Sequence, residues 1–258
     1  MFERVNRDRA KNHLPKLKFD PQLCDIARSH SMDMRDHHFF EHESPTYGLL
    51  ENRLHRAGYL FIKGRENLAE APTVDESEDG LLKSPHHYEN LMAEDITHVG
   101  IGIVKGGVMD ARNLTVTQIF ATPGKRESDA QAMTTIEAVL ARTRASAGNA
   151  PIASHPALNR MAQEQLATLL EDPNSSNLQE IGIHVAAKLA SSPIAGTSRV
   201  SVGAQVIVDS SQFVADGAVS SPGAKYYGIA VDHGSNHGSR VASGQLPRLR
   251  VLLLVGIR

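Results

Sequence analysis

The sequence predicts an α+β protein built from two similar halves. Apolar residues recur at helical spacing in the first part of the chain, and from Val99 the period changes to that of β-strands. An ungapped alignment at an offset of 135 residues matches the second half to the first. Pro123-Gly124 and the polar run after it form a natural boundary, so we expect domains at 1–124 and 130–258.

Helices are expected over most of the first 90 residues. Asp20-Pro21 gives a capping residue followed by proline at the first helical position, and Ser84-Pro85 repeats this signal. His86 and His87 then fall in a first helical turn, where the helix dipole disfavours a charged imidazole. The predicted helices are residues 2–11, a segment of about four turns from Pro21, Tyr47–Ala57, Val74–Leu82 and a segment that begins at Pro85.

Two other segments complete the first half. Val99–Val104 and Leu114–Phe120 predict a β-hairpin joined through Gly106-Gly107. Gly64–Ala69 is not amphipathic, and its simplest interpretation is a helix start with Glu66 near the positive end of the dipole.

The second half keeps the fold signal of the first and loses its chemistry. Pro21 and Leu23 match Pro156 and Leu158, whereas His30 is replaced by Gln165. The segment that should carry the equivalent of a later histidine, His42, is Glu171–Asn174, and Glu180 is the one candidate remnant of Glu66. We interpret 130–258 as a degenerate duplicate, the alternative being chance similarity of amphipathic helices. Strand-like runs are expected at Ile181–Ala186, Val200–Val208, Tyr226–Val231 and Leu249–Val255.

The stretch from His37 to Pro45 holds three histidines and two acids around a Phe pair. His38, Glu41 and His42 spell H-x-x-E-H, which on a helix would place two imidazoles on one face for zinc. Pro45 would end that helix within the motif. A second interpretation takes only His42 from this stretch and finds its partners further along the chain. A solvated turn suits His37 and His38 best.

Composition excludes several classes of protein. The 27 basic and 29 acidic residues give no case for nucleic-acid or anionic-membrane binding by net charge. The single Cys24 excludes an intramolecular disulfide framework, and its position on an apolar helix face predicts a buried, inert thiol. No apolar run is long enough to cross a bilayer, and no signal peptide follows Met1.

Residues 1–123 resemble the CAP superfamily (cysteine-rich secretory, antigen 5, pathogenesis-related 1) of the bacterial cysteine-poor type. The pieces that carry the resemblance stand in order: Val5–Arg9, Ala27–Met34, Phe39–Pro45, Gly58-Tyr59, Glu66–Ala69, Ser84–Leu91, Val99–Gly102 and Gln118–Phe120. The second half resembles the family only at its first two helices and last strands. The resemblance implies an α-β-α sandwich, in two tandem copies of which the second is degenerate. It also implies a cleft with two histidines and acidic residues.

His42, Glu66 and His87 match the family's cleft positions. Two neutral imidazoles and one carboxylate would leave a fourth position open on zinc or another divalent cation. Ser44 and Asn67 could supply hydrogen bonds behind these ligands. Three departures lie nearby: Ser84 stands near the position of an acid in many eukaryotic members, Leu81 replaces a tryptophan, and His86 replaces a glycine and could crowd the site or add a ligand.

Three functions are compatible with this set. The first is a secreted or envelope-associated binding protein whose cleft takes a divalent metal and a small lipidic or peptide ligand. The second is a metal-dependent peptidase or esterase that uses the same trio, although no activated serine or cysteine nucleophile is visible. The third is a structural or interaction protein with a relic cleft. CAP-like proteins act outside the cytoplasm, so we expect an extracytoplasmic protein whose leader was trimmed or lies upstream of Met1.

Overall fold

The computed structural model describes residues 1–167, 169, 177–233 and 248–258. It divides into two compact units, Met1–Gly124 and the chain from Lys125 onward. Each unit combines helices with one four-stranded mixed sheet, which confirms the predicted α+β class.

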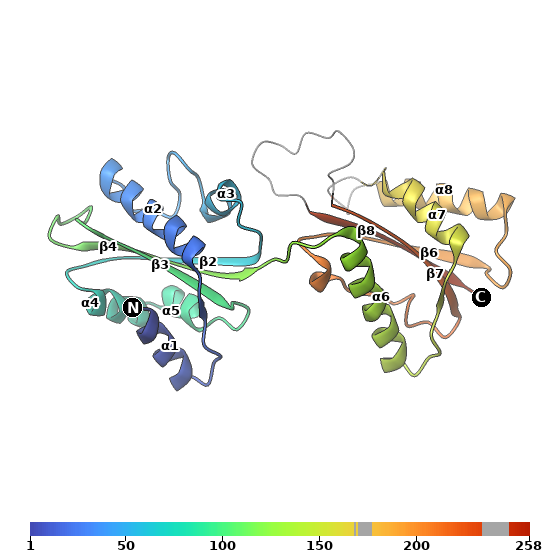
Figure 1. Ribbon diagram of the computed structural model, residues 1–258, viewed down its shortest axis with the longest axis horizontal. Coiled ribbons are helices and arrows are strands. Elements are labelled where there is room, and N and C mark those ends of the chain that lie inside the picture. The colour runs from blue at the N-terminus through green and yellow to red at the C-terminus, as the bar shows by residue number, and fades with distance from the viewer. Residues whose placement is uncertain (168, 170–176, 234–247) are drawn as a thin grey trace. The chain divides into compact units, whose positions relative to one another are not determined.

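The sheet of the first unit has the strand order β1-β3-β4-β2 (Figure 1). β1 (Lys18–Phe19) pairs in parallel with β3 (His98–Lys105). β3 and β4 (Leu114–Pro123) form the predicted hairpin, and β4 pairs antiparallel with β2 (Phe61–Ala71). Glu66 lies opposite Ile119 in this register, at the middle of β2, which is an edge strand of the sheet.

Helices cover both faces of this sheet, as expected of an α-β-α sandwich (Figure 1). One face carries α2 (Pro21–His37) and α3 (Leu50–Arg56). The other carries α1 (Phe2–Lys11), α4 (Val74–Lys83) and α5 (Pro85–Met92). Because successive strand residues point to opposite faces, each face of the sheet has its own apolar core.

Close packing holds α2 against the sheet. Asp20 caps the helix by accepting bonds from the backbone N–H groups of its first turn. A Cβ atom on Gly100 would lie 2.2 Å from the carbonyl carbon of Leu23, and one on Gly102 would lie 2.2 Å from the nitrogen of Arg28. These two glycines therefore allow helix and strand backbones to touch.

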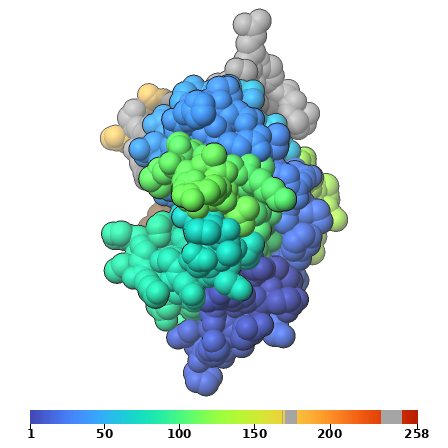
Figure 2. Space-filling model, turned by 90° about the vertical axis from the view of Figure 1, so that its left-hand side faces the viewer, coloured from blue at the N-terminus to red at the C-terminus, as the bar shows by residue number. Residues whose placement is uncertain are grey.

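The turn between β3 and β4 is fixed by a carboxylate from the neighbouring strand. The side chain of Glu70 accepts bonds from the backbone N–H groups of Val108, Met109 and Asp110 and from the amide of Asn113. Figure 2 shows this turn, in green, between α2 above and α4 below.

The second unit has the equivalent strand order, β5-β7-β8-β6. β5 (Ala153–Ser154) pairs in parallel with β7 (Ala224–Asp232), and β8 (Leu249–Ile257) pairs antiparallel with β7 and β6 (Arg199–Ile207). The helical elements are α6 (Asp129–Ser146), α7 (Pro156–Leu166), α8 (Asn177–Ser191) and the short 3-10 helix η1 (Ser210–Gln212).

Two details recur at matching positions in the units. Arg9 on α1 is buried and donates to the backbone carbonyl oxygens of Pro15, Leu91 and Ala93. Arg144 on α6 is buried in the same way and donates to those of Ala150, Val219 and Ser221. Gly228 packs against Leu158 as Gly100 packs against Leu23: a Cβ atom on Gly228 would lie 2.2 Å from the carbonyl carbon of Leu158.

Two segment predictions are wrong. Ile181–Ala186 lies inside α8, because its apolar residues face the core at helical spacing and not at strand spacing. Gly64–Ala69 lies inside β2 and does not start a helix.

These two corrections change which residue of the second unit corresponds to Glu66. Glu180 lies on α8, whereas the strand position equivalent to Glu66 is Val202, which pairs with Leu254 as Glu66 pairs with Ile119. The segment Glu171–Asn174 lies outside the described residues.

Candidate functional site

The histidine-rich stretch is not helical beyond His37. Helix α2 ends there, and His38 adopts the left-handed conformation with φ of 57°. His38 and His42 therefore do not share a helical face, and the H-x-x-E-H interpretation is wrong. The interpretation that takes only His42 from this stretch agrees with the structure.

Ser44 organises the turn that presents His42. Its buried hydroxyl donates to Asp33 Oδ2 at 2.6 Å and accepts from the backbone N–H groups of Thr46 and Tyr47. The turn after His42 is thus anchored to α2 by a single carboxylate. Ser44 acts by holding the backbone.

Glu66 forms the centre of the site. Its Oε1 lies 2.9 Å from His42 Nδ1, and Arg53 donates to both carboxylate oxygens, at 2.8 Å to Oε2 and 3.0 Å to Oε1. Arg53 also donates to the carbonyl oxygen of His42 at 3.0 Å. Burial alone would raise the pKa of Glu66, but the bonds from His42 and Arg53 outweigh it and leave the pKa below its usual value. Glu66 is therefore an ionised, fully engaged carboxylate.

The two cleft histidines have opposite electrostatic environments. The hydrogen bond to Glu66 raises the pKa of His42, whose side chain is 54% exposed. Burial lowers the pKa of His87, and the nearby charges of His42 and His86 lower it further. The charge of His42 acts on His87, so the two rings lie near each other. His86 is exposed beside them.

Asn67 links the strand to the helix that carries His87. It is fully buried, and its amide donates to the carbonyl oxygen of His87 at 3.1 Å and to Gln118. Asn90 on α5 donates to Asn67 Oδ1 and to the carbonyl oxygen of Glu66. His87 lies in the first turn of α5, as predicted, while Ser84 before it makes no side-chain cap.

Glu66 does not fit the role of a direct metal ligand. Both of its oxygens already accept charged hydrogen bonds, and Arg53 would repel a cation bound there. Among the residues that the structure describes, no group of three or more His, Cys, Asp or Glu side chains is placed to hold a metal ion. What does fit is a carboxylate that holds a histidine by Nδ1, an arrangement that orients imidazole ligands through their other nitrogen.

Sequence reasoning missed Arg53. It is buried on α3 between Leu50 and Leu54, and a basic residue inside an apolar stripe was the available signal. One other expectation is confirmed: Cys24 is buried, and burial raises the pKa of its thiol. His30 is a buried core histidine bonded to the carbonyl oxygen of Glu41.

Residues 2–120 match the family described as CAP, the cysteine-rich secretory protein family. Two curated relatives come from Bacillus subtilis strain 168: the uncharacterized protein YkwD, 34% identical over 108 residues, and the uncharacterized membrane protein YlbC, 34% identical over 107. The alignments cover 42% and 40% of this chain, and 42% and 30% of the relatives. The chain thus spans less than half the length of each.

Two solved structures are similar to part of the chain. An extracellular protein containing an SCP domain from Bacillus anthracis is 35% identical, with a TM-score of 0.42, over 46% of this chain and 38% of its own. An outer surface protein of Borrelia burgdorferi is 20% identical, with a TM-score of 0.43, over 47% of this chain and 89% of its own. Among the described residues, no helix is both long and apolar enough to cross a membrane.

Proposed function

Because residues 2–120 form a domain of the CAP family, we propose that this chain is an extracytoplasmic binding protein whose first unit carries the binding cleft. The observation that carries the proposal is the His42–Glu66–Arg53 network beside His87. The buried, ionised carboxylate of Glu66 holds the imidazole of His42 in one position at the cleft edge, where it can contact a ligand. Recovery of the protein from the envelope or medium of its native host would support the location, and a purely cytoplasmic fraction would contradict it.

We further propose that the cleft takes a divalent cation, with zinc as the first candidate. His42 Nε2 and His87 would hold it, Glu66 would orient His42 from behind, and a small lipidic or peptide ligand would complete the coordination. Two protein ligands leave more than one position open to such a ligand.

Zinc titration by calorimetry tests this proposal. The intact chain should bind one zinc, the His42→Ala/His87→Ala variant should bind none, and Glu66→Gln should weaken binding by about 10- to 100-fold. A control with two exposed histidines outside the cleft replaced, His13→Gly/His184→Ala, should behave like wild type. Equal zinc affinity in wild type and the cleft double variant would overturn the metal proposal.

A second candidate function is hydrolysis. The favouring observation is the opposite pKa shifts of His42 and His87, because an imidazole with a raised pKa suits the role of acid and a neighbouring one with a lowered pKa suits the role of base. Glu66 would not be the base, since Arg53 and His42 hold it ionised and occupied. Turnover of peptide or ester substrates that is insensitive to chelators and lost in His87→Ala would favour this function.

For the second unit, we propose a duplicate that kept the fold and lost the cleft. The equivalent strand order, the Arg9–Arg144 correspondence and Val202 at the position of Glu66 support it. A stoichiometry of one zinc per chain, and not two, is the expected outcome of the same titration. The unit would then serve as an interaction surface.

A further inference from the structure

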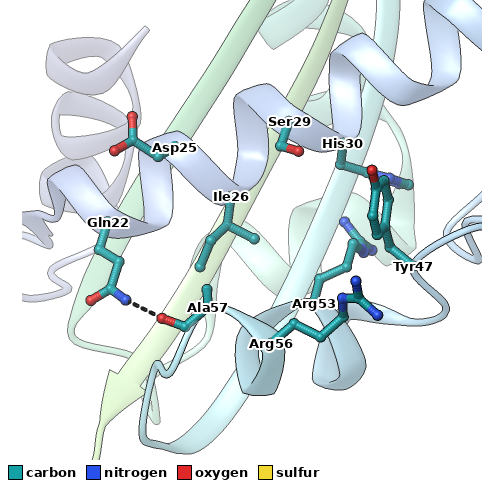
Figure 3. Close-up of a pocket in the computed structure, with 9 residues that line it drawn as sticks. All are labelled: Gln22, Asp25, Ile26, Ser29, His30, Tyr47, Arg53, Arg56 and Ala57. Atoms are coloured by element: carbon teal, nitrogen blue, oxygen red, sulfur yellow. Dashed lines mark hydrogen bonds between the residues drawn. The ribbon is translucent and has the colours of Figure 1, made fainter. Parts of the chain in front are cut away.

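Two consecutive residues of β2 each hold one histidine of the cleft, and they do so from opposite faces of the sheet. Glu66 points to the side of α2 and α3, where Arg53 lines a cavity between the two helices (Figure 3). Its carboxylate holds the ring of His42. Asn67 points to the side of α4 and α5, and its amide donates to the carbonyl oxygen of His87. The partners of Asn67 lead from the cleft into the interior of the unit.

A chain of buried amide groups extends from Asn67 to α4. Asn67 lies opposite Gln118 in the pairing of β2 with β4, and its Nδ2 donates to Gln118 Oε1 at 3.2 Å. Gln118 Nε2 donates in turn to Glu78 Oε2 at 2.7 Å. All three residues are 0% exposed, so water does not compete for these hydrogen bonds.

Acceptors at the two ends of this chain fix the direction of every amide in it. The carbonyl oxygen of His87 can only accept, so the atom of Asn67 that faces it is the nitrogen. Oε2 of Glu78 accepts whether the carboxyl is ionised or carries its proton on Oε1, so Gln118 turns its nitrogen to Glu78 and its oxygen to Asn67. The oxygen of Asn67 is left to accept from Asn90 on α5. Both ends therefore require the same arrangement.

Loss of the acceptor at position 78 would free one end of the chain. Gln118 would then be able to turn its nitrogen toward Asn67, where two N–H groups would face each other unless Asn67 turned as well. A reversed Asn67 would place its oxygen against the carbonyl oxygen of His87, and neither of these oxygens can donate. His87 would thus lose its hydrogen bond to the sheet.

The surroundings of Glu78 make a carboxyl group costly at this position. Its Oε1 has no partner among the described residues, and burial raises its pKa to about 7. The charge of Asp8 on α1 also raises this pKa, while Arg4 and the N-terminal amine lower it. A buried apolar side chain would avoid the cost of burial, so the hydrogen bond from Gln118 is what a carboxyl group adds here.

We propose that Glu78 is a positioning residue of the cleft, which acts through Gln118 and Asn67 to hold the carbonyl group of His87. Helix α5 is eight residues long, so contacts with neighbouring elements determine its position more than its own hydrogen bonds do. The role in binding rests on the proposed function, because it takes His87 as a ligand of the cleft. The chain of hydrogen bonds can be tested without a metal.

Two variants of the full chain separate the contact of Glu78 from its charge. Glu78→Gln keeps an acceptor of the same length and removes the charge, whereas Glu78→Asp keeps the charge and ends one methylene short of Gln118. In metal-free protein at pH 8, the NMR signals of the His87 carbonyl carbon and the Asn67 side-chain amide should match wild type in Glu78→Gln and shift in Glu78→Asp. Thr115→Val removes a different buried hydrogen bond of β4 and should leave both signals in place. Unchanged signals in Glu78→Asp, or equal shifts in both Glu78 variants, would overturn the proposal.

Zinc titration of the same variants measures the consequence for the cleft. Glu78→Gln and Thr115→Val should bind zinc within about twofold of wild type, and Glu78→Asp should bind it at least about tenfold more weakly. Gln118→Met breaks the chain from β4 and should have the same effect as Glu78→Asp. A wild-type chain that binds no zinc would overturn the metal proposal, and the NMR signals would still decide whether Glu78 holds His87. Shifted signals with an unchanged zinc affinity would overturn the positioning role.

Discussion

Replacement of Glu78 by glutamine should remove a pH dependence from the stability of the first unit. Glu78 lies on α4, is fully buried, and accepts one bond from Gln118 at 2.7 Å, while its Oε1 has no partner among the described residues. Burial raises its pKa from an ordinary value of 4.5 to about 7, against the opposing bond from Gln118. Between these two values the native unit holds a proton that the unfolded chain has released.

Stability therefore falls as pH rises through this window. The contribution of the protonated carboxyl is complete below pH 4.5 and lost above about pH 7. At about 1.4 kcal/mol per pKa unit, the loss amounts to roughly 3 kcal/mol. Glutamine keeps the shape and the acceptor for Gln118 but does not titrate, so Glu78→Gln should abolish this slope.

Native-state hydrogen exchange at pH 5 and pH 8 measures the effect. Peptides from β4 report the opening free energy of the first unit, and peptides from β8 serve as the reference in the same molecule. The difference in opening free energy between wild type and Glu78→Gln should change by roughly 3 kcal/mol between the two pH values for peptides of β4. For peptides of β8 it should stay constant. Glu89→Gln, at an exposed position of α5, is the control. Parallel profiles for wild type and Glu78→Gln would refute the reasoning.

Three other substitutions have definite expected outcomes. Gly102→Ala should destabilise the first unit by more than about 2 kcal/mol in urea unfolding, because its Cβ would collide with the α2 backbone, whereas Gly80→Ala, with open space around it, should be neutral or stabilising. Arg144→Met should leave three carbonyl oxygens unpaired and weaken exchange protection in the second unit by about 3 kcal/mol, with none lost in the first. Glu66→Gln should lower the pKa of His42 in an NMR titration, since the bond to the carboxylate is what raises it; an unchanged His42 pKa would contradict the assigned pair.

Local signals predicted the helices and the hairpin well. The Asp20 cap, the glycine turn between β3 and β4 and the proline start of α5 each act over a few residues, so the sequence displays them directly. Strand β2 was missed because Glu66 and Asn67 occupy interior positions where a strand usually carries apolar side chains. Functional residues broke the pattern that would have revealed the strand.

The site could be predicted only in part. His42 and Glu66 do meet, although 24 positions separate them, and the resemblance placed both in one cleft. The ligand role of Glu66 could not be judged from sequence, because it depends on whether another side chain already occupies its oxygens. Arg53 does so from the inward face of α3, and its sequence position inside the apolar stripe does not reveal which group it binds.

Arg53 has a consequence beyond holding Glu66. Its terminal nitrogens bind the carboxylate of Glu66 and also the backbone carbonyl oxygen of His42, so one guanidinium group holds both partners of the His42–Glu66 pair. The direction in which His42 points therefore depends on α3, a helix to which His42 does not belong. Any change that shifts α3 along the sheet would move the carboxylate and the loop of His42 together.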